Sequence, residues 1–244
     1  MEQATRIGRF SHMLVAGLAC LFAACQSEPL LSLEERLQTL PAGFPPIDYP
    51  AGNEFTIERW QLGKKLFYDP ILSIDSSLSC GSCHQAFHGF ADDQALSPGV
   101  FGRPGKTNAP SLGNVAFHPY FLREGGVPTL EMQILVPIQE SNEFNHNIVD
   151  IAAQLQRDSA YVRMSQQAYG RDPDAFVITR AISTFERSLI SGNSPYDQYQ
   201  NQGKKQALNG AEQRGMDLFF SEKANCSRCH GGINFTDYSF QNNG

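Results

Sequence analysis

Two copies of the pattern Cys-x-x-Cys-His limit what this chain can fold into more than any other feature of its sequence. The first copy is SCGSCH, Ser79 to His84, and the second is NCSRCH, Asn225 to His230. Of the six cysteines in the chain, two lie in or next to an apolar N-terminal segment and four form the two copies. Any account of the fold must therefore explain what paired cysteines followed by a histidine do twice in one chain.

The N-terminal segment has the features of an export signal. Two arginines precede the apolar run Met13 to Ala24, which is too short to span a bilayer. Small residues followed by Cys25 end the run, as in a bacterial lipoprotein processing site. We therefore expect residues 1–25 to be a lipoprotein-type signal peptide and residues 26–50 to be a linker. Lipidation of Cys25, which would anchor the protein to a membrane surface, is a hypothesis, and simple cleavage nearby is the alternative.

Several kinds of site use closely spaced cysteines. Two disulfides would suit an exported chain, but they have no use for a histidine after each pair. A structural zinc site usually takes its cysteine pairs from segments about 15–20 residues apart, and two histidines would be surplus to its four ligands. A thioredoxin-like redox pair requires a βαβ setting, which the sequence lacks.

Covalent attachment of c-type haem explains the spacing best. Two thiols one helical turn apart can each form a thioether with a haem vinyl group, and the histidine that follows can then bind the iron. The sequence therefore predicts two covalently bound haems c. The expected attachment residues are Cys80, Cys83, Cys226 and Cys229, and the expected iron ligands are His84 and His230.

Hydrophobic periodicity predicts a mainly α fold. Apolar residues recur at helical spacing in Thr56–Phe67, where Thr56 is a suitable N-cap, and again in Asn147–Arg157 and Pro173–Ile190. The stretch from Ala86 to Val127 has no sustained period and is rich in Gly, Pro and Asn, as expected of a long functional loop. We predict two cytochrome c-like haem domains, comprising residues 51–178 and residues 179–244.

The second of these domains is expected to be partial. A cytochrome domain normally continues beyond its haem motif to a helix and a distal iron ligand, whereas this chain ends soon after His230. All five methionines precede Cys226, so the usual distal methionine of a second haem is absent from this sequence.

The formal net charge of −6 gives no reason to expect nucleic acid as a partner.

The chain resembles the bacterial di-haem cytochrome c peroxidase and MauG-type family over roughly Gln61 to Gly244. The matching stretches are LGKKLFYDPILS, TNAPSLGNVAFHPYF, LEMQILVPIQESNEF, AISTFERSLISGNSPYDQY and CSRCHGGINFTD. The resemblance implies a periplasmic enzyme with a peroxidatic N-terminal haem domain and an electron-transferring C-terminal one. Its substrate would be hydrogen peroxide and its electron donor a small cytochrome c or a cupredoxin. A homodimer is a further expectation.

The resemblance also suggests roles for residues outside the two motifs. Glu143 matches the loop glutamate that moves protons during peroxide cleavage, and the alternative is an ordinary solvated carboxylate. Gln133 matches a glutamine of the MauG-type distal pocket, and Pro137 a proline of the pocket wall. Asn108 matches an asparagine that helps to hold calcium between the domains, and the alternative is a turn residue before Pro110.

The sequence departs from the family pattern at two internal positions. A histidine that caps the first iron in the peroxidases is replaced at the matching place by Val100-Phe101, so we expect that iron to be open without reductive activation. His88, His118 and His146 are expected to be surface or locally hydrogen-bonded histidines, and iron ligation by His88 or His118 is the less favoured alternative. Arg123 stands where the family commonly has a tryptophan between the haems, so the sequence does not define the electron route between them, and pairing of Arg123 with a haem propionate is the alternative role.

The motifs and the family resemblance together leave three candidate functions. The leading one is a periplasmic cytochrome c peroxidase that reduces hydrogen peroxide to water with electrons from a small redox protein. A di-haem electron carrier without peroxide chemistry is the second. A MauG-like oxidant of a partner protein is the third, and Gln133 and the missing capping histidine give it mild support.

Overall fold

The computed structural model describes residues 31–242. The expected signal peptide and Cys25 therefore lie outside the described residues. The chain divides into two compact units, residues 1–36 and residues 37–244. Helix α2 (Leu33–Gln38) begins in the first unit, and every other described helix belongs to the second.

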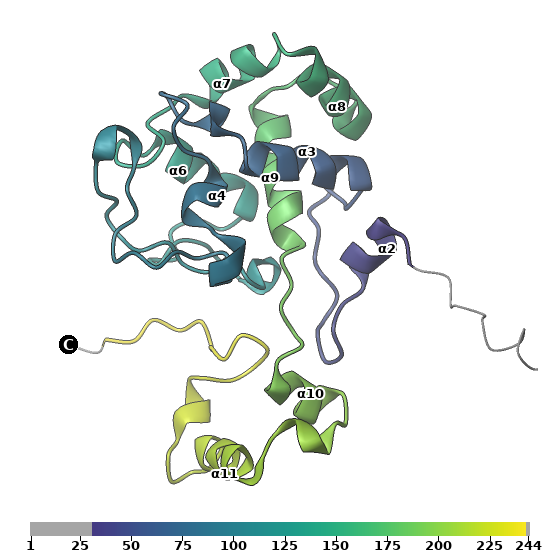
Figure 1. The fold of residues 1–244 in the computed structure, drawn as a ribbon, viewed down its shortest axis with the longest axis vertical. Helices are drawn as coiled ribbons and strands as arrows, with labels where there is room; N and C mark the ends of the chain where they lie inside the picture. Colours follow the sequence, from purple (N-terminus) through teal and green to yellow (C-terminus); the bar gives the residue numbers. More distant parts are fainter. Residues whose placement is uncertain (1–30, 243–244) are drawn as a thin grey trace, which may run out of the picture. The chain divides into compact units, whose positions relative to one another are not determined.

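Two crossing helices form the centre of the second unit (Figure 1). Helix α3 (Ile57–Phe67) begins at Thr56, whose side-chain oxygen accepts a hydrogen bond from the backbone N–H of Arg59. Helix α9 (Ala175–Arg187) begins in the same way at Asp174, whose carboxylate accepts from the N–H of Val177. Both helices are confirmed, and the N-cap at Thr56 is the one the sequence predicted.

A single large core surrounds this crossing. Its buried side chains come from α3, α9, α7 (Ile148–Leu155), α8 (Ser159–Tyr169) and the loops between them. Ile178, Ile182 and Phe185 on α9 are each less than 5% exposed, as is Phe67 on α3. Residue 178, where the sequence placed the division between two haem domains, lies inside α9, and residues on both sides of it belong to this one core. The division into two haem domains itself stays a prediction.

The remaining helices are short. They are α4 (Cys80–Cys83), α5 (Leu130–Gln133), α6 (Leu135–Gln139), α10 (Pro195–Asn201) and α11 (Gly210–Phe219). Single 3₁₀ turns occupy η1 (Pro70–Leu72), η2 (Ala86–His88), η3 (Val100–Gly102), η4 (Val115–Phe117), η5 (Lys205–Ala207) and η6 (Cys226–Arg228). The expected long irregular segment between Ala86 and Val127 is confirmed, because it contains only 3₁₀ turns and isolated β-bridges. Within residues 31–242 there is no β-strand, so the fold is mainly α as predicted.

A buried polar network fastens α5 to α9. Arg187 donates from Nη1 to Oε1 of Glu131 (2.6 Å) and from Nη2 to Oε2 of the same carboxylate (3.0 Å). Ser183 Oγ and Asn53 Nδ2 also donate to Oε1 of Glu131, at 2.9 and 3.0 Å. A charged pair this deep needs its hydrogen bonds satisfied, and here they are. The network therefore fixes the segment that leads into Gln133.

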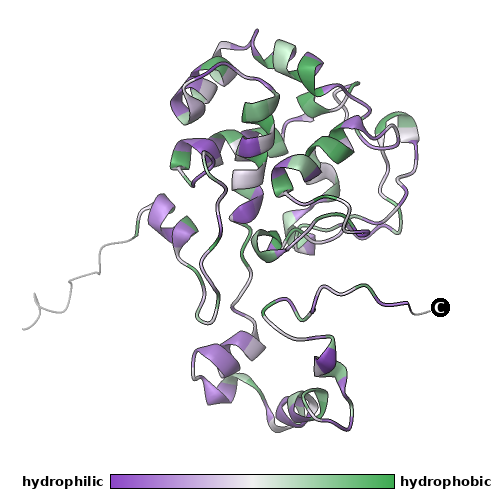
Figure 2. Ribbon diagram, turned by 180° about the vertical axis from the view of Figure 1, so that it is seen from behind, coloured by the Kyte–Doolittle hydropathy of each residue, from purple (hydrophilic) through white to green (hydrophobic). Residues whose placement is uncertain are grey.

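The region of the second motif is less buried. No residue of α10 or α11 is buried, and Figure 2 colours α10 mostly as hydrophilic. A small group of rings supports the motif: Phe235 lies edge-on to Phe219 and Tyr196, with ring centroids 5.9 and 5.1 Å apart.

In the part of the chain that the structure describes, no helix has the length and apolar character needed to cross a membrane.

The α3–α9 crossing gives a direct prediction for stability. A Cβ atom at Gly63 would overlap the carbonyl oxygen of Ala181, so Gly63→Ala should push the two helices apart. We expect a loss of about 1–3 kcal/mol in the free energy of unfolding, measured by denaturant titration of the holoprotein. Gly215→Ala in α11 is the matched control, because no atom lies within 4 Å of its added Cβ. It should be neutral or stabilising, and equal losses in both variants would contradict the packing argument.

Candidate functional site

The first Cys-x-x-Cys-His motif lies in the wall of a large cavity. The cavity has a volume of about 810 Å³, within the range of cofactor pockets. Cys80, Cys83 and His84 line it together with Gln133 and Glu143. Residues from α4, from the irregular segment after it, from α5 and α6 and from α9 complete the wall. Residues far apart in the sequence thus meet around one space.

The two cysteines of this motif sit on a capped helical turn. In α4 the hydroxyl of Ser82 accepts from the N–H of Ser79, which closes a capping box around the turn. The thiols of Cys80 and Cys83 are free, as are those of Cys226 and Cys229, so no disulfide joins any of these four. Burial raises the pKa of the Cys80 thiol well above its usual value, and a neighbouring carboxylate, Glu186, raises it further.

Each motif histidine is oriented by a backbone carbonyl. The Nδ1 atom of His84 lies 2.9 Å from the carbonyl oxygen of Phe90, and the Nδ1 atom of His230 lies 3.1 Å from that of Phe235. Because a carbonyl can only accept, Nδ1 carries the proton and Nε2 keeps its lone pair. Both phenylalanines have positive φ (59° and 53°), an uncommon conformation for a bulky residue that aims each carbonyl at its ring. The two motifs therefore share a geometry that suits metal ligation through Nε2.

The chemistry of this donor set fits a haem at each motif. At the first motif, two free thiols and an imidazole with its Nε2 lone pair available face one cavity. Burial lowers the pKa of His84, which favours the neutral, metal-binding form. At the second motif the same local arrangement recurs, with partly exposed thiols and an exposed His230.

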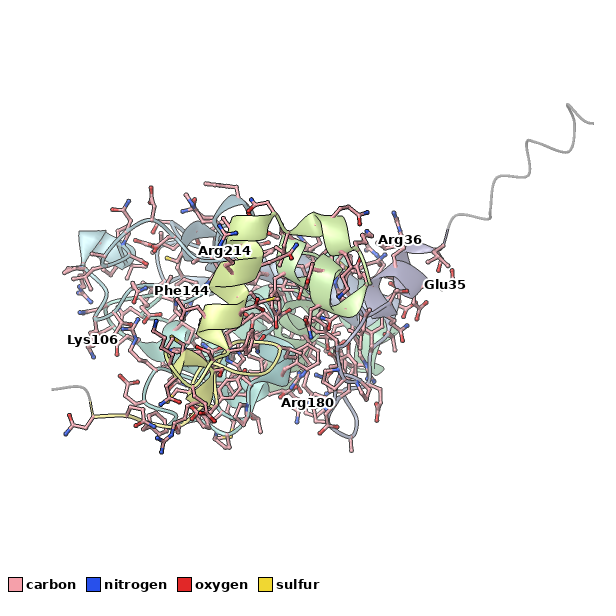
Figure 3. All side chains as sticks on the ribbon, turned by 90° about the horizontal axis from the view of Figure 1, so that it is seen from below. Glu35, Arg36, Lys106, Phe144, Arg180 and Arg214 are labelled. Carbon is pink, nitrogen blue, oxygen red and sulfur yellow. The ribbon has the colours of Figure 1, made fainter. Side chains whose placement is uncertain are left out.

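Glu143 lies on a tight turn in the cavity wall. Its N–H donates to the carbonyl of Glu140 (2.9 Å), and its own carbonyl accepts from the N–H of Val100 (3.0 Å). Burial raises the pKa of Glu143; the charge of Glu140 raises it further, and that of Lys106 lowers it. Lys106 forms an ion pair with Glu140 (2.9 Å) and projects outward in the view of Figure 3. Glu143 is thus placed as a carboxyl that can hold and release a proton.

The loop around Val100 supports this turn. Val100 is fully buried, Phe101 is 61% exposed, and neither of the two lines the cavity. A Cβ atom at Gly99 would overlap the carbonyl of Asn142, so only glycine allows the two loops to approach this closely. The loop at Val100-Phe101, where the peroxidases have their capping histidine, therefore holds the turn of Glu143 in position.

Asn108 and Arg123 also line the cavity, and they contact each other there. The guanidinium of Arg123 donates to the side-chain oxygen of Asn108, the atom that would have to bind calcium. Within residues 31–242 no group of three or more His, Cys, Asp or Glu side chains could hold a metal ion. Calcium binding by Asn108 stays a prediction, which these residues do not test.

The other histidines separate into two kinds. His118 lines the cavity and is stacked on Phe121, and burial lowers its pKa. His88 and His146 are not part of the cavity wall, and His146 is buried and accepts a hydrogen bond from the N–H of Asn147. The expectation of a local hydrogen bond is therefore confirmed for His146.

Sequence reasoning missed two contributors to the cavity. Glu186 in the last turn of α9 is 5% exposed and lines the wall. Its position four residues after Ile182 puts an acid on the apolar face of α9, a signal that was available in the sequence. The segment Ile233–Tyr238, which follows the second motif, also lines the first cavity. There Tyr238 packs edge-on to His118 and Tyr120, with ring centroids 5.3 and 6.2 Å apart.

Comparison with known proteins places this arrangement among di-haem proteins. A family model described as di-haem cytochrome c peroxidase matches residues 57–206. The methylamine utilization protein MauG of Methylorubrum extorquens is 31% identical over 97% of this chain and 66% of its own length. Cytochrome c peroxidase Ccp of Escherichia coli is 34% identical over 75% of this chain and 39% of its own length.

A solved structure of a MauG-like protein is also similar to this chain in fold and in sequence. The crystal structure of a MauG-like protein associated with microbial copper homeostasis superposes with a TM-score of 0.76 and 37% identity, over 81% of this chain and 59% of that one. The chain thus spans between 39% and 66% of the length of these three proteins.

Proposed function

Because the chain belongs to the di-haem cytochrome c peroxidase family, we propose that the protein reduces hydrogen peroxide to water, with electrons from a small cytochrome c or a cupredoxin. The observation that carries the proposal is the shared cavity of Cys80, Cys83, His84, Gln133 and Glu143. Reduction of one peroxide consumes two electrons and two protons and yields two water molecules. The site therefore has to supply proton transfer as well as electrons.

The chain's own residues divide this work. Cys80 and Cys83 would hold the first haem, and His84 would bind its iron through Nε2. Cys226, Cys229 and His230 would hold the second haem in the same way. When bound, haem supplies the one-electron redox chemistry that the protein alone lacks.

Proton transfer is assigned to Glu143. Its carboxylate accepts the proton from one oxygen of the bound peroxide and delivers it to the other oxygen, which leaves as water. Gln133 is a hydrogen-bonding side chain of the same wall and would orient the peroxide. The raised pKa of Glu143 suits this role, because a general base and acid works best with a pKa near the working pH.

Electrons would reach this site from the region of the second motif. Support comes from the segment Ile233–Tyr238, which follows that motif and contributes to the wall of the first cavity. We place the protein in the periplasm, with lipidation of Cys25 as the route to a membrane surface. The export-type N-terminus of the sequence supports both assignments.

A MauG-like role is the second candidate. It is favoured by the 37% identity to the MauG-like structure and by the absence of a histidine at Val100-Phe101. In that role the oxidising equivalents of peroxide would be used on a partner protein rather than discharged by an electron donor.

Stopped-flow mixing of the fully reduced holoprotein with peroxide tests the proposal. We expect steady consumption of peroxide when reduced cytochrome c or a reduced cupredoxin is supplied, with two donors oxidised for each peroxide. Slow consumption with these donors but rapid, peroxide-dependent oxidation of an added protein would favour the MauG-like role. If the holoprotein does not react with peroxide in either of these assays, electron transfer would be the only one of the three functions left.

A further inference from the structure

Two adjacent residues in the last turn of α9, Glu186 and Arg187, have different surroundings. Arg187 is 6% exposed and directs its guanidinium to Glu131, which is 8% exposed. Two hydrogen bonds join the pair, so the positive charge of Arg187 is already neutralised. Glu186 is buried to the same degree, but it lies in the wall of the first haem cavity.

The carboxyl of Glu186 has no partner of this kind. Its Oε2 atom is buried and has no hydrogen-bond partner among residues 31–242. Burial raises the pKa of Glu186 to about 8, while Arg187 lowers it and Glu131 raises it. A buried carboxyl with an unsatisfied oxygen is costly, and an apolar side chain would serve packing better.

The carboxyl lies close to the place where the first haem would be joined to the chain. The charge of Glu186 is the largest electrostatic contribution that raises the pKa of the Cys80 thiol, after burial itself. Cys80 would be a thioether in the holoprotein and would not titrate. The titratable groups that interact electrostatically with Glu186 are thus Arg187 on its own helix, Glu131 on α5 and Cys80 on α4. Besides two tyrosines, the other titratable side chains in the cavity wall are Cys83, His84, His118, Arg123, Glu124 and Glu143.

We propose that Glu186 is the proton-exchanging group of the first haem pocket, which takes up a proton when the pocket gains an electron and releases it when the electron leaves. The physical reason is charge balance in a medium of low dielectric constant. An added electron removes one unit of positive charge from the iron, so a nearby carboxylate loses an attractive partner and binds a proton more tightly. The inference rests on the haem site proposed above, and it does not require peroxide turnover.

The step balances in protons and electrons. The donor protein supplies one electron, solvent supplies one proton, and the carboxylate of Glu186 becomes a neutral acid. No bond to the cofactor forms or breaks. On oxidation the proton is released inside the pocket, on whose wall Glu143 also lies. Glu186 would therefore deliver protons in step with electrons, and peroxide reduction consumes the two in equal number.

Spectroelectrochemical titration of the full-length holoprotein between pH 6 and pH 10 tests the inference. In the wild type we expect the midpoint potential of the first haem to fall as pH rises around pH 8, approaching the limit of about 59 mV per unit for one proton per electron. In Glu186→Gln this slope should be lost within the same window. Glu124→Gln is the matched control, because Glu124 also lines the cavity but is exposed, and it should keep the slope.

Equal slopes in the wild type and in Glu186→Gln would overturn the inference, even if both proteins reduce peroxide. A protein that shows the slope but fails to consume peroxide would instead overturn the proposed function alone. If Glu186→Gln does not fold or load haem, infrared difference spectra of the wild type and of Glu186→Asp decide. A protonated-carboxyl band should appear on reduction and should differ in frequency between the two proteins. Absence of the band, or the same frequency in both, would contradict the assignment.

Discussion

Replacing Glu143 by Gln should slow peroxide reduction by about 10²- to 10⁴-fold while leaving both haems attached. The amide keeps the size of the side chain and its place on the turn between Glu140 and Val100, because the two hydrogen bonds that Glu143 makes there come from its backbone atoms. It cannot, however, accept the proton of peroxide. The rate constant for the reaction of the reduced holoprotein with peroxide, followed by stopped-flow absorbance, measures the loss.

The pH dependence gives this prediction a second readout. The working form of Glu143 is the carboxylate, so the rate should rise as pH increases through its pKa. Since burial and the charge of Glu140 raise that pKa, the rising limb should lie above the ordinary range of a glutamate. In Glu143→Gln the limb should be absent.

Glu140→Gln is the control for the charge of the same turn. Glu140 pairs with the exposed Lys106 and does not line the cavity, so its substitution should change the rate only a few-fold. A loss in Glu140→Gln as large as that in Glu143→Gln would assign the effect to the shape of the turn. An unchanged rate in Glu143→Gln would remove this residue from the chemistry.

The sequence predicted those parts of the fold that depend on local signals. Thr56 caps α3 as expected, and α7 lies within the predicted periodic stretch Asn147–Arg157, because an N-cap and an apolar period are both local signals. The irregular segment after the first motif was recognised by its lack of such a period, and the resemblance to the family placed Gln133 and Glu143 in one stretch. The structure places both in the wall of the cavity that contains the first motif.

Tertiary contacts account for what the sequence could not supply. That Gly99 meets Asn142, or that Arg123 takes the oxygen of Asn108, depends on how two aperiodic loops pack, and no local pattern encodes it. The unusual environment of Glu186 arises because its neighbour Arg187 is already neutralised by Glu131, which is distant in the sequence. The sequence shows that Glu186 is a charged residue on an apolar helix face, but it does not show which groups surround the carboxyl.

The pair formed by Arg187 and Glu131 should be the most costly single interaction to break in the described part of the chain. Arg187→Met leaves a carboxylate with an exposed fraction of only 8% and no countercharge, and Glu131→Gln leaves the guanidinium without one. Each single substitution should lower the free energy of unfolding by about 3–5 kcal/mol at pH 7. Denaturant titration of the holoprotein measures both. The double variant, with no buried charge left over, should recover a large part of the loss.

Acid should remove the same contribution. Burial alone would raise the pKa of Glu131, but the hydrogen bonds and charge of Arg187 outweigh burial and lower it to about 2. A carboxyl whose pKa is lowered on folding stabilises the protein fully above its unfolded pKa, near 4.5, and loses this contribution as pH falls toward 2. The wild type should therefore lose stability between about pH 4.5 and pH 2 more steeply than Glu131→Gln does. Lys106→Met, which breaks an exposed pair with Glu140, should cost no more than about 1 kcal/mol and change the acid slope only slightly. Parallel acid slopes in the wild type and in Glu131→Gln would show that this pair does not hold α5 against α9.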